Sequence, residues 1–458
     1  MKSGERSVGK LKVKEIEFDS NKINQVKEKI ANSEWGIIFQ SGDLSNEDCR
    51  YEILTSDPIC KIVTIDGSTT IETQGAITYA KENPLITIKN VRKSMFGNVS
   101  STPYPFIGGS AGYFSYDLGR EFEDFKDIST DDTNMPQMAV GIYNWAVIID
   151  KKIGRVHLVM IEVENAPKLE ERLQLVFDCS PLVQPNFNLK STWYSNMTRE
   201  EYFKIFHRVR EHILDGDIYQ VNIAQRFKAT YNGNEYTFFK ELIEKNNVPF
   251  GAYFNTPYGK ILSISPERFL KLDNNKLTSK PIKGTRPRRC DQKLDEEQKS
   301  LLLTSEKERA ENVMIVDLLR NDISKVCKPS TVNVPKLFDI ETYPAVHHLV
   351  STISGTLNEN LEAEDAFESC FPGGSITGTP KIRAMDIIEK LEPHRRSIYC
   401  GSLGYISADG NMDSNISIRT LLCKNNSIYC WAGGGWTIDS NAESEYQETL
   451  DKVSKIIY

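Results

Sequence analysis

Hydrophobic and polar positions follow two different periods along the chain, and the changes between them locate the predicted elements. Near the N-terminus the pattern alternates as in a strand, takes helical spacing, then alternates again, over residues 10–18, 21–32 and 35–42. Two long apolar runs, residues 138–150 and 155–163, flank a short polar turn and predict an antiparallel hairpin. The first part of the chain is therefore expected to be α+β rather than a series of βαβ units.

The remainder of the chain has the same mixed character. Residues 198–217 have an amphipathic helical pattern, with Thr198 as the predicted N-cap and Gly216 just past the helix end. An alternating strand follows at residues 218–227, and a long helix is predicted over about residues 292–320.

A segment rich in Pro and Asn, CSPLVQPNFN at residues 179–188, separates the two parts. At 458 residues the chain is long enough for two large units or about three smaller ones. We place a boundary near Lys190, which gives an N-terminal region, 1–190, and a C-terminal region, 191–458.

Charge and composition exclude several classes of protein. The chain has 56 basic and 63 acidic residues, a net charge of −7, so a general affinity for nucleic acid is not expected. No apolar run reaches the roughly 18 residues of a membrane span, and the N-terminus lacks the apolar stretch of a signal peptide. Nine cysteines without a C-x-x-C pair fit reduced thiols rather than disulfides or a zinc site. We expect a soluble, cytoplasmic protein with no nucleic-acid or membrane partner.

Two pairs of glutamates carry the first candidate chemistry. Glu308 and Glu311, and likewise Glu445 and Glu448, lie three residues apart on predicted helices, so each pair shares one helix face. A pair of this kind is also compatible with an ordinary solvated face, and that alternative stays open. Together the two pairs would offer the carboxylate oxygens that Mg²⁺ prefers.

The segment FPGGSITGTPK, residues 371–381, places a glycine-rich turn before a predicted helix. Thr379 and Pro380 stand where a nucleotide-binding loop requires Lys and Ser or Thr, so a loop of that kind is excluded. With Thr379 as N-cap and Pro380 at the first helical position, the free backbone N–H groups would suit an anion such as a carboxylate. The alternative is an ordinary capped helix start.

A candidate nucleophile and a candidate acid complete the local features. Lys283 lies in the basic segment SKPIKGTRPRR, and neighbouring cations would lower its pKa and make its amine nucleophilic. Glu267 in SPERF follows a predicted strand, and a closed site would raise its pKa so that it serves as a general acid. A solvated basic loop and a simple ion pair are the respective alternatives.

These features belong to an ordered series of motifs. From about Thr198 to the C-terminus the chain resembles the chorismate-utilising enzymes, through IYQVNIAQRF, SPERF, PIKGTRPR, YPAVHHLVSTISG, FPGGSITGTPK and ESEYQET. A weaker resemblance continues N-terminally in WGIIFQSG and GSAGYFSYDLGR. The resemblance implies an α+β protein with a four-layer α/β/β/α fold, in which antiparallel sheets stack between helices.

The resemblance also implies roles for individual residues. Lys283 and Glu267 match the catalytic positions of the family. Glu311 and Glu448 match its Mg²⁺ ligands, and Glu308 and Glu445 lie beside them. The positions that match substrate-binding residues are Gln220, His348, Ser375, Thr377, Gly378, Tyr399, Arg419, Gly433, Gly434, Gly435 and Lys452.

The implied reaction replaces the C4 hydroxyl of chorismate by an amino group from ammonia, giving 4-amino-4-deoxychorismate on the 4-aminobenzoate branch of folate biosynthesis. Glu267 would protonate the leaving hydroxyl, Lys283 would attack C2, and ammonia would then add at C4 and expel the lysine. Relatives that activate water have a lysine where this chain has Gln220, and anthranilate-forming relatives have alanine where it has Lys283. An anthranilate-forming enzyme is the alternative, and a non-catalytic regulatory paralogue is less favoured.

A partner and an effector follow from the same resemblance. Ammonia in this family comes from a glutaminase with a cysteine nucleophile, and this sequence has no G-x-C-x-G elbow, so a glutaminase subunit is the implied heterodimer partner. Trp436 departs from the family, which usually has a branched aliphatic residue after the glycines. Relatives hold tryptophan in the N-terminal region, and an effector role is one possibility for the loosely matching residues Ser41, Cys49, Arg50, Tyr51, Pro249, Phe250 and Gly251.

Overall fold

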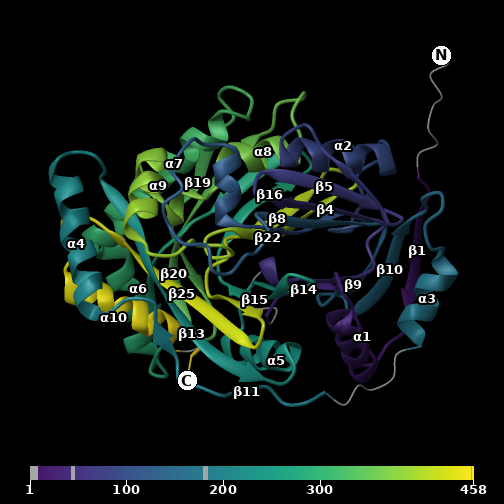
Figure 1. Ribbon diagram of the computed structural model, residues 1–458, viewed down its shortest axis with the longest axis horizontal. Coiled ribbons are helices and arrows are strands. Elements are labelled where there is room, and N and C mark those ends of the chain that lie inside the picture. Colours follow the sequence, from purple (N-terminus) through teal and green to yellow (C-terminus); the bar gives the residue numbers. More distant parts are fainter. Residues whose placement is uncertain (1–8, 43–46, 179–183, 455, 458) are drawn as a thin grey trace.

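Two large antiparallel sheets form the centre of the molecule (Figure 1). The computed structural model describes residues 9–42, 47–178, 184–454 and 456–457. In spatial order, the first sheet contains β1 (Leu11–Ile16), β10 (Arg155–Ile161), β9 (Trp145–Asp150), β3 (Tyr51–Thr55), β2 (Ile37–Gln40), β14 (Phe250–Thr256), β15 (Gly259–Ser265), β24 (Thr420–Lys424), β25 (Ser427–Trp436), β13 (Gln220–Asn232) and β11 (Asn188–Leu189). Two short strands also pair with β13, namely β12 (Tyr194–Ser195) and β21 (Gly378–Thr379).

The second sheet carries the segment with the candidate nucleophile at one end. Its strands are, in spatial order, β18 (Ile282–Pro287), β20 (Val346–Thr356), β17 (Lys276–Lys280), β16 (Arg268–Asp273), β23 (Met412–Asn415), β22 (Ser402–Ser407), β7 (Gly109–Phe114), β8 (Met138–Tyr143), β4 (Cys60–Ile65), β5 (Ser68–Thr73) and β6 (Ala76–Tyr79). A further strand, β19 (Asn333–Thr342), pairs with β20.

Helices cover the outer faces of the two sheets. They are α1 (Ser20–Asn32), α2 (Pro84–Phe96), α3 (Leu169–Phe177), α4 (Arg199–Leu214), α5 (Glu235–Asn246), α6 (Gln292–Thr304), α7 (Glu306–Ser324), α8 (Ala363–Cys370), α9 (Lys381–Leu391) and α10 (Ala442–Val453), with 3-10 turns η1 (Glu47–Cys49), η2 (Tyr116–Glu121) and η3 (Gly374–Ile376). Figure 1 shows α2, α7 and α8 along the top and α1 and α5 along the bottom. The four-layer arrangement implied by the resemblance is confirmed.

Apolar side chains from both sheets meet in the space between them. Ile37 and Ile148 of the first sheet and Ile62 and Val140 of the second are fully buried in one cluster. A second cluster packs the helices α1 and α5 onto the outer face of the first sheet. Each sheet is thus apolar on both faces over much of its width, which explains the near-continuous apolar runs in the sequence.

One predicted strand is in fact two. Residues 138–150 divide at Asn144, so that β8 joins the second sheet and β9 the first. The backbone carbonyl of Asn144 accepts from the Ile161 N–H, and its side-chain oxygen accepts from Arg172, which satisfies the polar groups at the crossing. The predicted hairpin of β9 with β10 is confirmed.

The prediction of one long helix over residues 292–320 is also wrong. It breaks at Ser305, which ends α6 and whose hydroxyl accepts from the Glu308 N–H to begin α7. Serine is a strong N-cap, so it starts a new helix there instead of continuing the old one. The N-cap at Thr198 is confirmed, since its side chain accepts from the Glu201 N–H.

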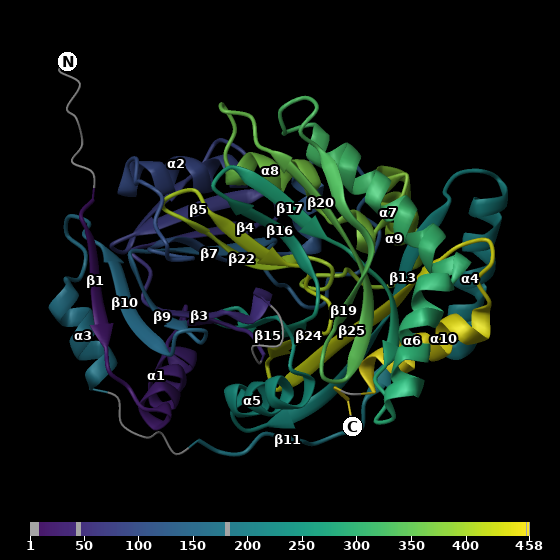
Figure 2. The ribbon, with the colours of Figure 1, turned by 180° about the vertical axis from the view of Figure 1, so that it is seen from behind.

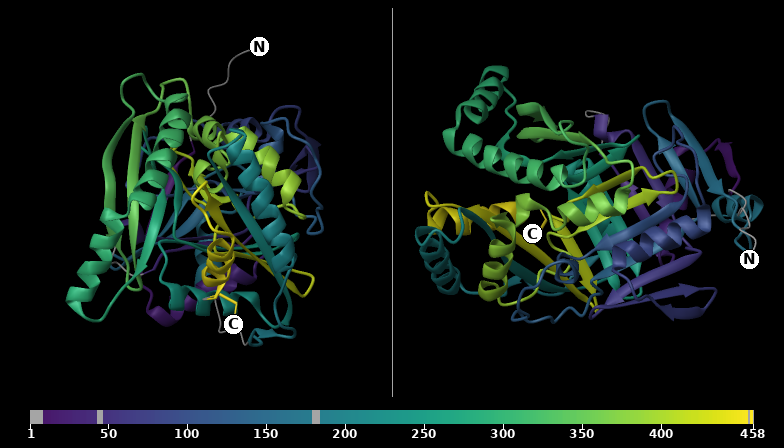
Figure 3. Two further views of the ribbon diagram at one scale, coloured as in Figure 1. Left: turned by 90° about the vertical axis from the view of Figure 1, so that its left-hand side faces the viewer. Right: turned by 90° about the horizontal axis from the view of Figure 1, so that it is seen from above.

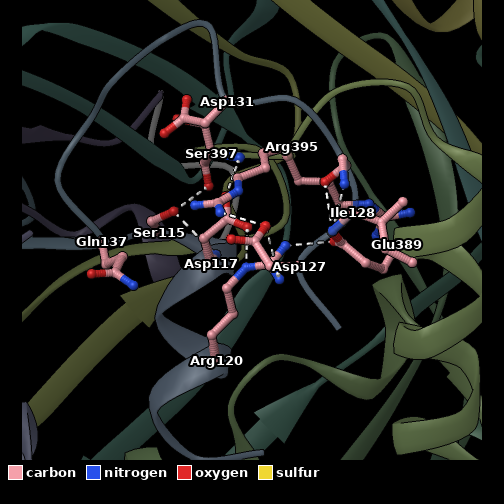
Figure 4. Close-up of polar contacts among 12 residues, drawn as sticks. Ser115, Asp117, Arg120, Asp127, Ile128, Asp131, Gln137, Glu389, Arg395 and Ser397 are labelled. Atoms are coloured by element: carbon pink, nitrogen blue, oxygen red, sulfur yellow. Dashed lines mark hydrogen bonds and ion pairs between the residues drawn. The ribbon is translucent and has the colours of Figure 1, made fainter. Parts of the chain in front are cut away.

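Both sheets contain strands from each side of residue 190, which stays a proposed boundary in the sequence only. Residues 179–183 of the segment that suggested it lie outside the described residues. A polar cluster further joins the two regions, where Arg120 of η2 contacts Asp117 and Glu389 of α9 (Figure 4). Glu389 also accepts from the backbone N–H groups of Ile128 and Ser129, so α9 is fixed at its C-terminal end by the N-terminal region.

No helix in the described part of the chain is long and apolar enough to cross a membrane.

Candidate active site

Glu267 and Lys283 lie on separate segments, Glu267 in the link from the first sheet to the second and Lys283 in the end strand of the second sheet. Glu267 lies between β15 and β16 and is 5% exposed. Lys283 is half-buried in β18, where the pairing with β20 shifts register between Ile282 and Thr285. A shift of this kind turns a side chain out of the regular alternation, here next to the positive φ of Gly284.

Ser375 of η3 connects the two candidate catalytic residues. Its hydroxyl donates to Glu267 Oε1 at 2.8 Å, and its backbone carbonyl accepts from Lys283 Nζ at 3.2 Å. The glycine-rich segment therefore meets both the acid and the amine, which sequence spacing alone did not indicate.

Burial shifts the pKa values of this pair in opposite directions. It raises the pKa of Glu267, although the Lys283 amine and the Ser375 hydroxyl partly offset the effect. It lowers the pKa of Lys283, although the carboxylates of Glu267 and Glu311 oppose that shift. Both shifts favour the neutral forms, a protonated acid and a free amine, which a general acid and a nucleophile need.

The two acidic pairs lie on α7 and α10, two helices at the same end of the molecule (Figure 2). Burial raises the pKa of Glu311, and the charges of Glu448 and Glu308 add to the shift. Burial likewise raises the pKa of Glu445, to which the charge of Glu448 contributes. Carboxylates on separate helices are thus close enough to repel one another.

Basic groups contact three of these carboxylates. Glu308 pairs with Arg286 at 3.3 Å, Glu311 with Lys307 at 3.9 Å and Glu448 with Lys452 at 2.6 Å. Within the described residues, no group of three or more His, Cys, Asp or Glu side chains is arranged to hold a metal ion. The glutamates lie in one region but do not form a closed ligand cage.

The donor set nevertheless fits a hard cation. Glu308 Oε2 and Glu445 Oε2 are buried and have no hydrogen-bond partner among the described residues. A side chain at Gly434 would fill the space in front of Glu445 and Glu448, because its Cβ would lie 2.8 Å and 3.7 Å from their oxygens. Buried carboxylate oxygens without partners are costly unless a cation or a donor satisfies them.

Arg419 provides a cation that no described side chain neutralises. Its guanidinium makes no hydrogen bond or ion pair with the described residues, and burial lowers its pKa. Lys452, by contrast, pairs with Glu448 and donates to the carbonyl of Gly433. An unpaired, half-buried guanidinium has a geometry suited to binding a carboxylate.

The other sequence-predicted residues lie in strands and turns around this region. Gln220 begins β13 and is buried, with Oε1 unpaired among the described residues. Thr377 is buried with its hydroxyl bonded to the carbonyl of Gly373, and His348 Nδ1 lies 2.8 Å from the Thr285 hydroxyl. Tyr399 is fully buried, and burial raises its pKa well above the ordinary value.

Gly378 explains why the glycine-rich segment cannot carry a side chain there. Its φ is +151°, and a Cβ would collide with the carbonyl oxygen of Gln220. The predicted N-cap at Thr379 is wrong, because α9 begins at Lys381 with Pro380 as the cap residue. Thr379 instead pairs with Gln220 in β21, and this strand pairing delays the helix.

One polar residue of the site was missed by the sequence motifs. Asn222 is 8% exposed, and its Nδ2 has no hydrogen-bond partner among the described residues. It follows Gln220 by two positions in β13, so the alternation of the strand places both on one face. That alternation was the signal available in the sequence.

A separate cavity of about 480 Å³ is lined by residues of both the N-terminal and the C-terminal region and does not include the candidate catalytic residues. Six of the seven residues matched to an effector site line it, namely Ser41, Arg50, Tyr51, Pro249, Phe250 and Gly251. Cys49 does not line the cavity, but its carbonyl accepts from the Ser41 hydroxyl. Asp48, Arg268 and Asp413 form an ion-pair network on its wall.

Comparison with known proteins identifies relatives over nearly the whole length. The chain is 46% identical to aminodeoxychorismate synthase component 1 of Escherichia coli (strain K12), over 94% of each protein. It is 33% identical to anthranilate synthase component 1 of Aquifex aeolicus (strain VF5), over 94% of this chain and 90% of the relative.

A solved structure agrees with this relationship. Anthranilate synthase component I from Streptococcus pneumoniae TIGR4 superimposes with a TM-score of 0.79 at 29% identity, covering 90% of this chain and 93% of the other. The family model described as chorismate binding enzyme matches residues 41–458. The chain therefore belongs to the chorismate binding enzyme family.

Proposed function

We propose that this chain converts chorismate and ammonia to 4-amino-4-deoxychorismate, as the synthase component of an aminodeoxychorismate synthase. The observation that carries the proposal is the pair of buried Glu267 and half-buried Lys283, joined through Ser375. Three relatives at 43–46% sequence identity bear the name aminodeoxychorismate synthase component 1.

The first half of the reaction uses both members of the pair. Protonated Glu267 transfers its proton to the C4 hydroxyl, which leaves as water because hydroxide is a poor leaving group. The Lys283 amine forms a bond to C2 while both ring double bonds shift, from C1=C2 to C1=C6 and from C5=C6 to C4=C5, and the C4–O bond breaks. The shift of the Lys283 pKa by burial supports this role, since only the neutral amine is a nucleophile.

The second half reverses the direction of attack. Ammonia forms a bond to C4, both double bonds shift back to C5=C6 and C1=C2, and the C2–N bond to Lys283 breaks. The nitrogen thus reaches the carbon that lost its oxygen, and the enolpyruvyl ether is retained. Glu267, now ionised, is available to take the proton that the new amino group loses.

We propose Mg²⁺ as the cofactor, held by Glu308, Glu311, Glu445 and Glu448. When bound, the ion would offset the negative charge between these carboxylates and the dianionic substrate. Arg419, Lys452 and the backbone of Gly378 and Gly433–Gly435 would bind the substrate carboxylates. Gln220, His348, Thr377 and Tyr399 would line the remainder of the pocket.

We further propose that a glutaminase component supplies ammonia, in keeping with the component numbering of the relatives.

We also propose a cytoplasmic location. The eight cysteines within the described residues are free thiols, as is usual for proteins of a reducing compartment. The separate cavity of about 480 Å³ is proposed to bind tryptophan as an effector, and a thermal shift on adding tryptophan would check this.

The second candidate is anthranilate formation, since anthranilate synthases are also among the relatives. It is disfavoured by Lys283, because alanine takes that position in the anthranilate-forming enzymes that the sequence resembles. The two functions differ in a measurable way, since anthranilate formation releases pyruvate and aminodeoxychorismate formation does not.

Product analysis tests the proposed function directly. The purified chain with chorismate, Mg²⁺ and an ammonium salt at alkaline pH should yield 4-amino-4-deoxychorismate by mass spectrometry, without pyruvate. Anthranilate together with pyruvate would transfer the assignment to the second candidate. Absence of any chorismate conversion would contradict both.

A further inference from the structure

Ser375 is hydrogen-bonded to both the candidate acid, Glu267, and the candidate amine, Lys283. Its side chain fixes Glu267 and its backbone carbonyl fixes Lys283. Any displacement of η3 therefore moves a partner of both reacting groups at once. The contacts that hold η3 in place consequently affect the geometry of the reaction.

Arg396 supplies two of these contacts from outside the segment. Its Nη1 donates to the carbonyl of Ile376 at 2.9 Å, one residue after Ser375. Its Nη2 donates to the carbonyl of Asn222 at 2.5 Å, and the Asn222 N–H donates in turn to the carbonyl of Thr377 at 2.8 Å. One guanidinium thus connects the segment 375–377 to strand β13.

The position of Arg396 is itself fixed on several sides. Its Nε and Nη2 donate to the carboxylate of Glu392 at 3.0 Å and 2.7 Å, and Glu392 also accepts from the Ala224 N–H. The guanidinium lies over the ring of Tyr116, 4.9 Å from its centroid, and the whole side chain is only 1% exposed. A buried ion pair of this kind is held in a single arrangement, because a change leaves a charge without its partner.

We propose that Arg396 is a positioning residue. It holds the segment 375–377 in place, so that Ser375 keeps Glu267 and Lys283 at the relative positions that the reaction needs. The inference rests on the proposed function for its kinetic test. The hydrogen bonds that position the segment 375–377 belong to the fold and do not depend on that function. Arg396 makes no contact with either reacting group and acts through Ile376 and Asn222.

Lysine cannot replace arginine in this role. A lysine would keep a positive charge near Glu392, but its single ammonium cannot reach Glu392 and two carbonyls that lie in different directions. Arg396→Lys therefore keeps the positive charge beside Glu392 but removes the planar guanidinium that donates to the carbonyls of both Ile376 and Asn222. Arg395 offers a matched control, because its Nη2 donates to the exposed Asp127 (Figure 4).

The kinetic test is a double-mutant cycle of Arg396→Lys with Ser375→Ala, measured with chorismate, Mg²⁺ and ammonia. Arg396→Lys is expected to lower kcat ~10- to 100-fold with KM for chorismate within ~3-fold, because the geometry of the reacting groups is lost rather than binding. The double variant should lose at least ~5-fold less than the product of the two single losses, since both changes act on the same bonds. Arg395→Lys should leave kcat unchanged.

Hydrogen exchange provides a readout that does not depend on activity. In Arg396→Lys the peptide covering residues 373–379 should exchange faster, while peptides of β9 and β10 should match the wild type. In Arg395→Lys the peptide covering residues 373–379 should exchange as in the wild type. If Arg396→Lys fails to fold, Glu392→Gln, which loosens the hold on Arg396, takes its place in both experiments.

The outcomes separate the two proposals. A wild type that makes no product contradicts the proposed function, and the exchange measurement still decides the inference. A wild-type kcat in Arg396→Lys, strictly multiplicative losses in the cycle, or unchanged exchange at residues 373–379 would each overturn the role of Arg396.

Discussion

At the scale of residues, burial is what turns ordinary side chains into a reactive set. It raises the pKa of Glu267, lowers that of Lys283 and lowers that of Arg419. The sequence indicated the types of these residues, but burial depends on neighbours that are distant along the chain. Ser375, for example, lies 108 positions from Glu267 and contacts it directly.

The metal proposal leads to a prediction about single glutamates. Changing Glu311 or Glu448 to Gln should reduce Mg²⁺-dependent turnover by ~100-fold or more, because a neutral amide is a poor ligand for a hard cation. Steady-state kinetics over a Mg²⁺ titration, with calorimetric Mg²⁺ binding beside it, would measure the effect.

Glu297 serves as the control, since it is exposed on the outer part of α6 and pairs with no described residue. Glu297→Gln should behave as wild type in both assays. Equal losses at Glu297, Glu311 and Glu448 would mean that the acidic pairs have no special role.

At the scale of elements, a buried ion-pair network ties η1 to the two strands beside the catalytic pair. Asp48 contacts Arg268, which follows Glu267, and Lys280, which ends β17 three residues before Lys283. Asp413 and Glu341 complete the network on the far sides of these two cations. The network therefore links the wall of the 480 Å³ cavity to the segments that contain Glu267 and Lys283.

This network predicts a stability that depends on pH. Burial alone would raise the pKa of Asp48, but Arg268 and Lys280 outweigh it and bring the pKa down to about 2. A depressed pKa contributes stability above the unfolded value near 4, and the contribution is lost as pH falls through the folded value. Asp48→Asn should therefore lower the free energy of unfolding by about 2–3 kcal/mol at pH 7, and by about half of that at pH 3.

Urea unfolding of both proteins from pH 7 to pH 3 checks this prediction. Asp439→Asn is the control, because Asp439 is exposed and makes no contact with a described side chain. A loss at Asp48 that is the same at every pH would show that the effect is one of packing and not of charge.

Elements with strong local signals were predicted well, and those decided by tertiary contacts were not. The amphipathic helix after Thr198 and the hairpin of β9 and β10 follow from period and capping alone. The passage of the chain between the sheets at Asn144 and the late start of α9 depend on which strand pairs with the backbone there. The hydrophobic periodicity of these two segments does not indicate the pairing partner.

At the scale of the whole molecule, the candidate site lies where two helical arms project from the same end. Figure 3 shows α6 and α7 in green and α10 in yellow, extending side by side in the right-hand view. Lys283 lies in a strand of the second sheet and Glu267 in the link between the two sheets, whereas Gln220 and Gly433–Gly435 lie in strands of the first. Neither sheet alone contains the site, so the stacking of the sheets is a condition for it.

This division limits what the sequence could predict. The motifs identified most of the polar residues, because they matched a family. They could not indicate that Arg396 reaches Ile376 and Asn222, since these contacts span 20 and 174 positions. The four layers likewise came from the resemblance, because strand patterns do not encode the order of strands in a sheet.

A prediction about the nitrogen source concerns the chain as a whole. The purified chain should form product with ammonia but not with glutamine, because its sequence has no G-x-C-x-G elbow to hydrolyse the amide. Parallel assays with ammonium chloride and glutamine would measure the difference. Glutamine-dependent turnover by the isolated chain, free of contaminating glutaminase, would refute the need for a second component.

The covalent role of Lys283 is the central claim, and the adduct itself is the most direct test. With chorismate and Mg²⁺ but no ammonia, a quenched reaction should leave a mass increase on the peptide that contains Lys283, and Lys283→Ala should abolish it. Lys283→Arg keeps the charge but is no nucleophile, so it should be inactive. An active Lys283→Arg enzyme that forms the same product, with no adduct on the wild type, would contradict the account.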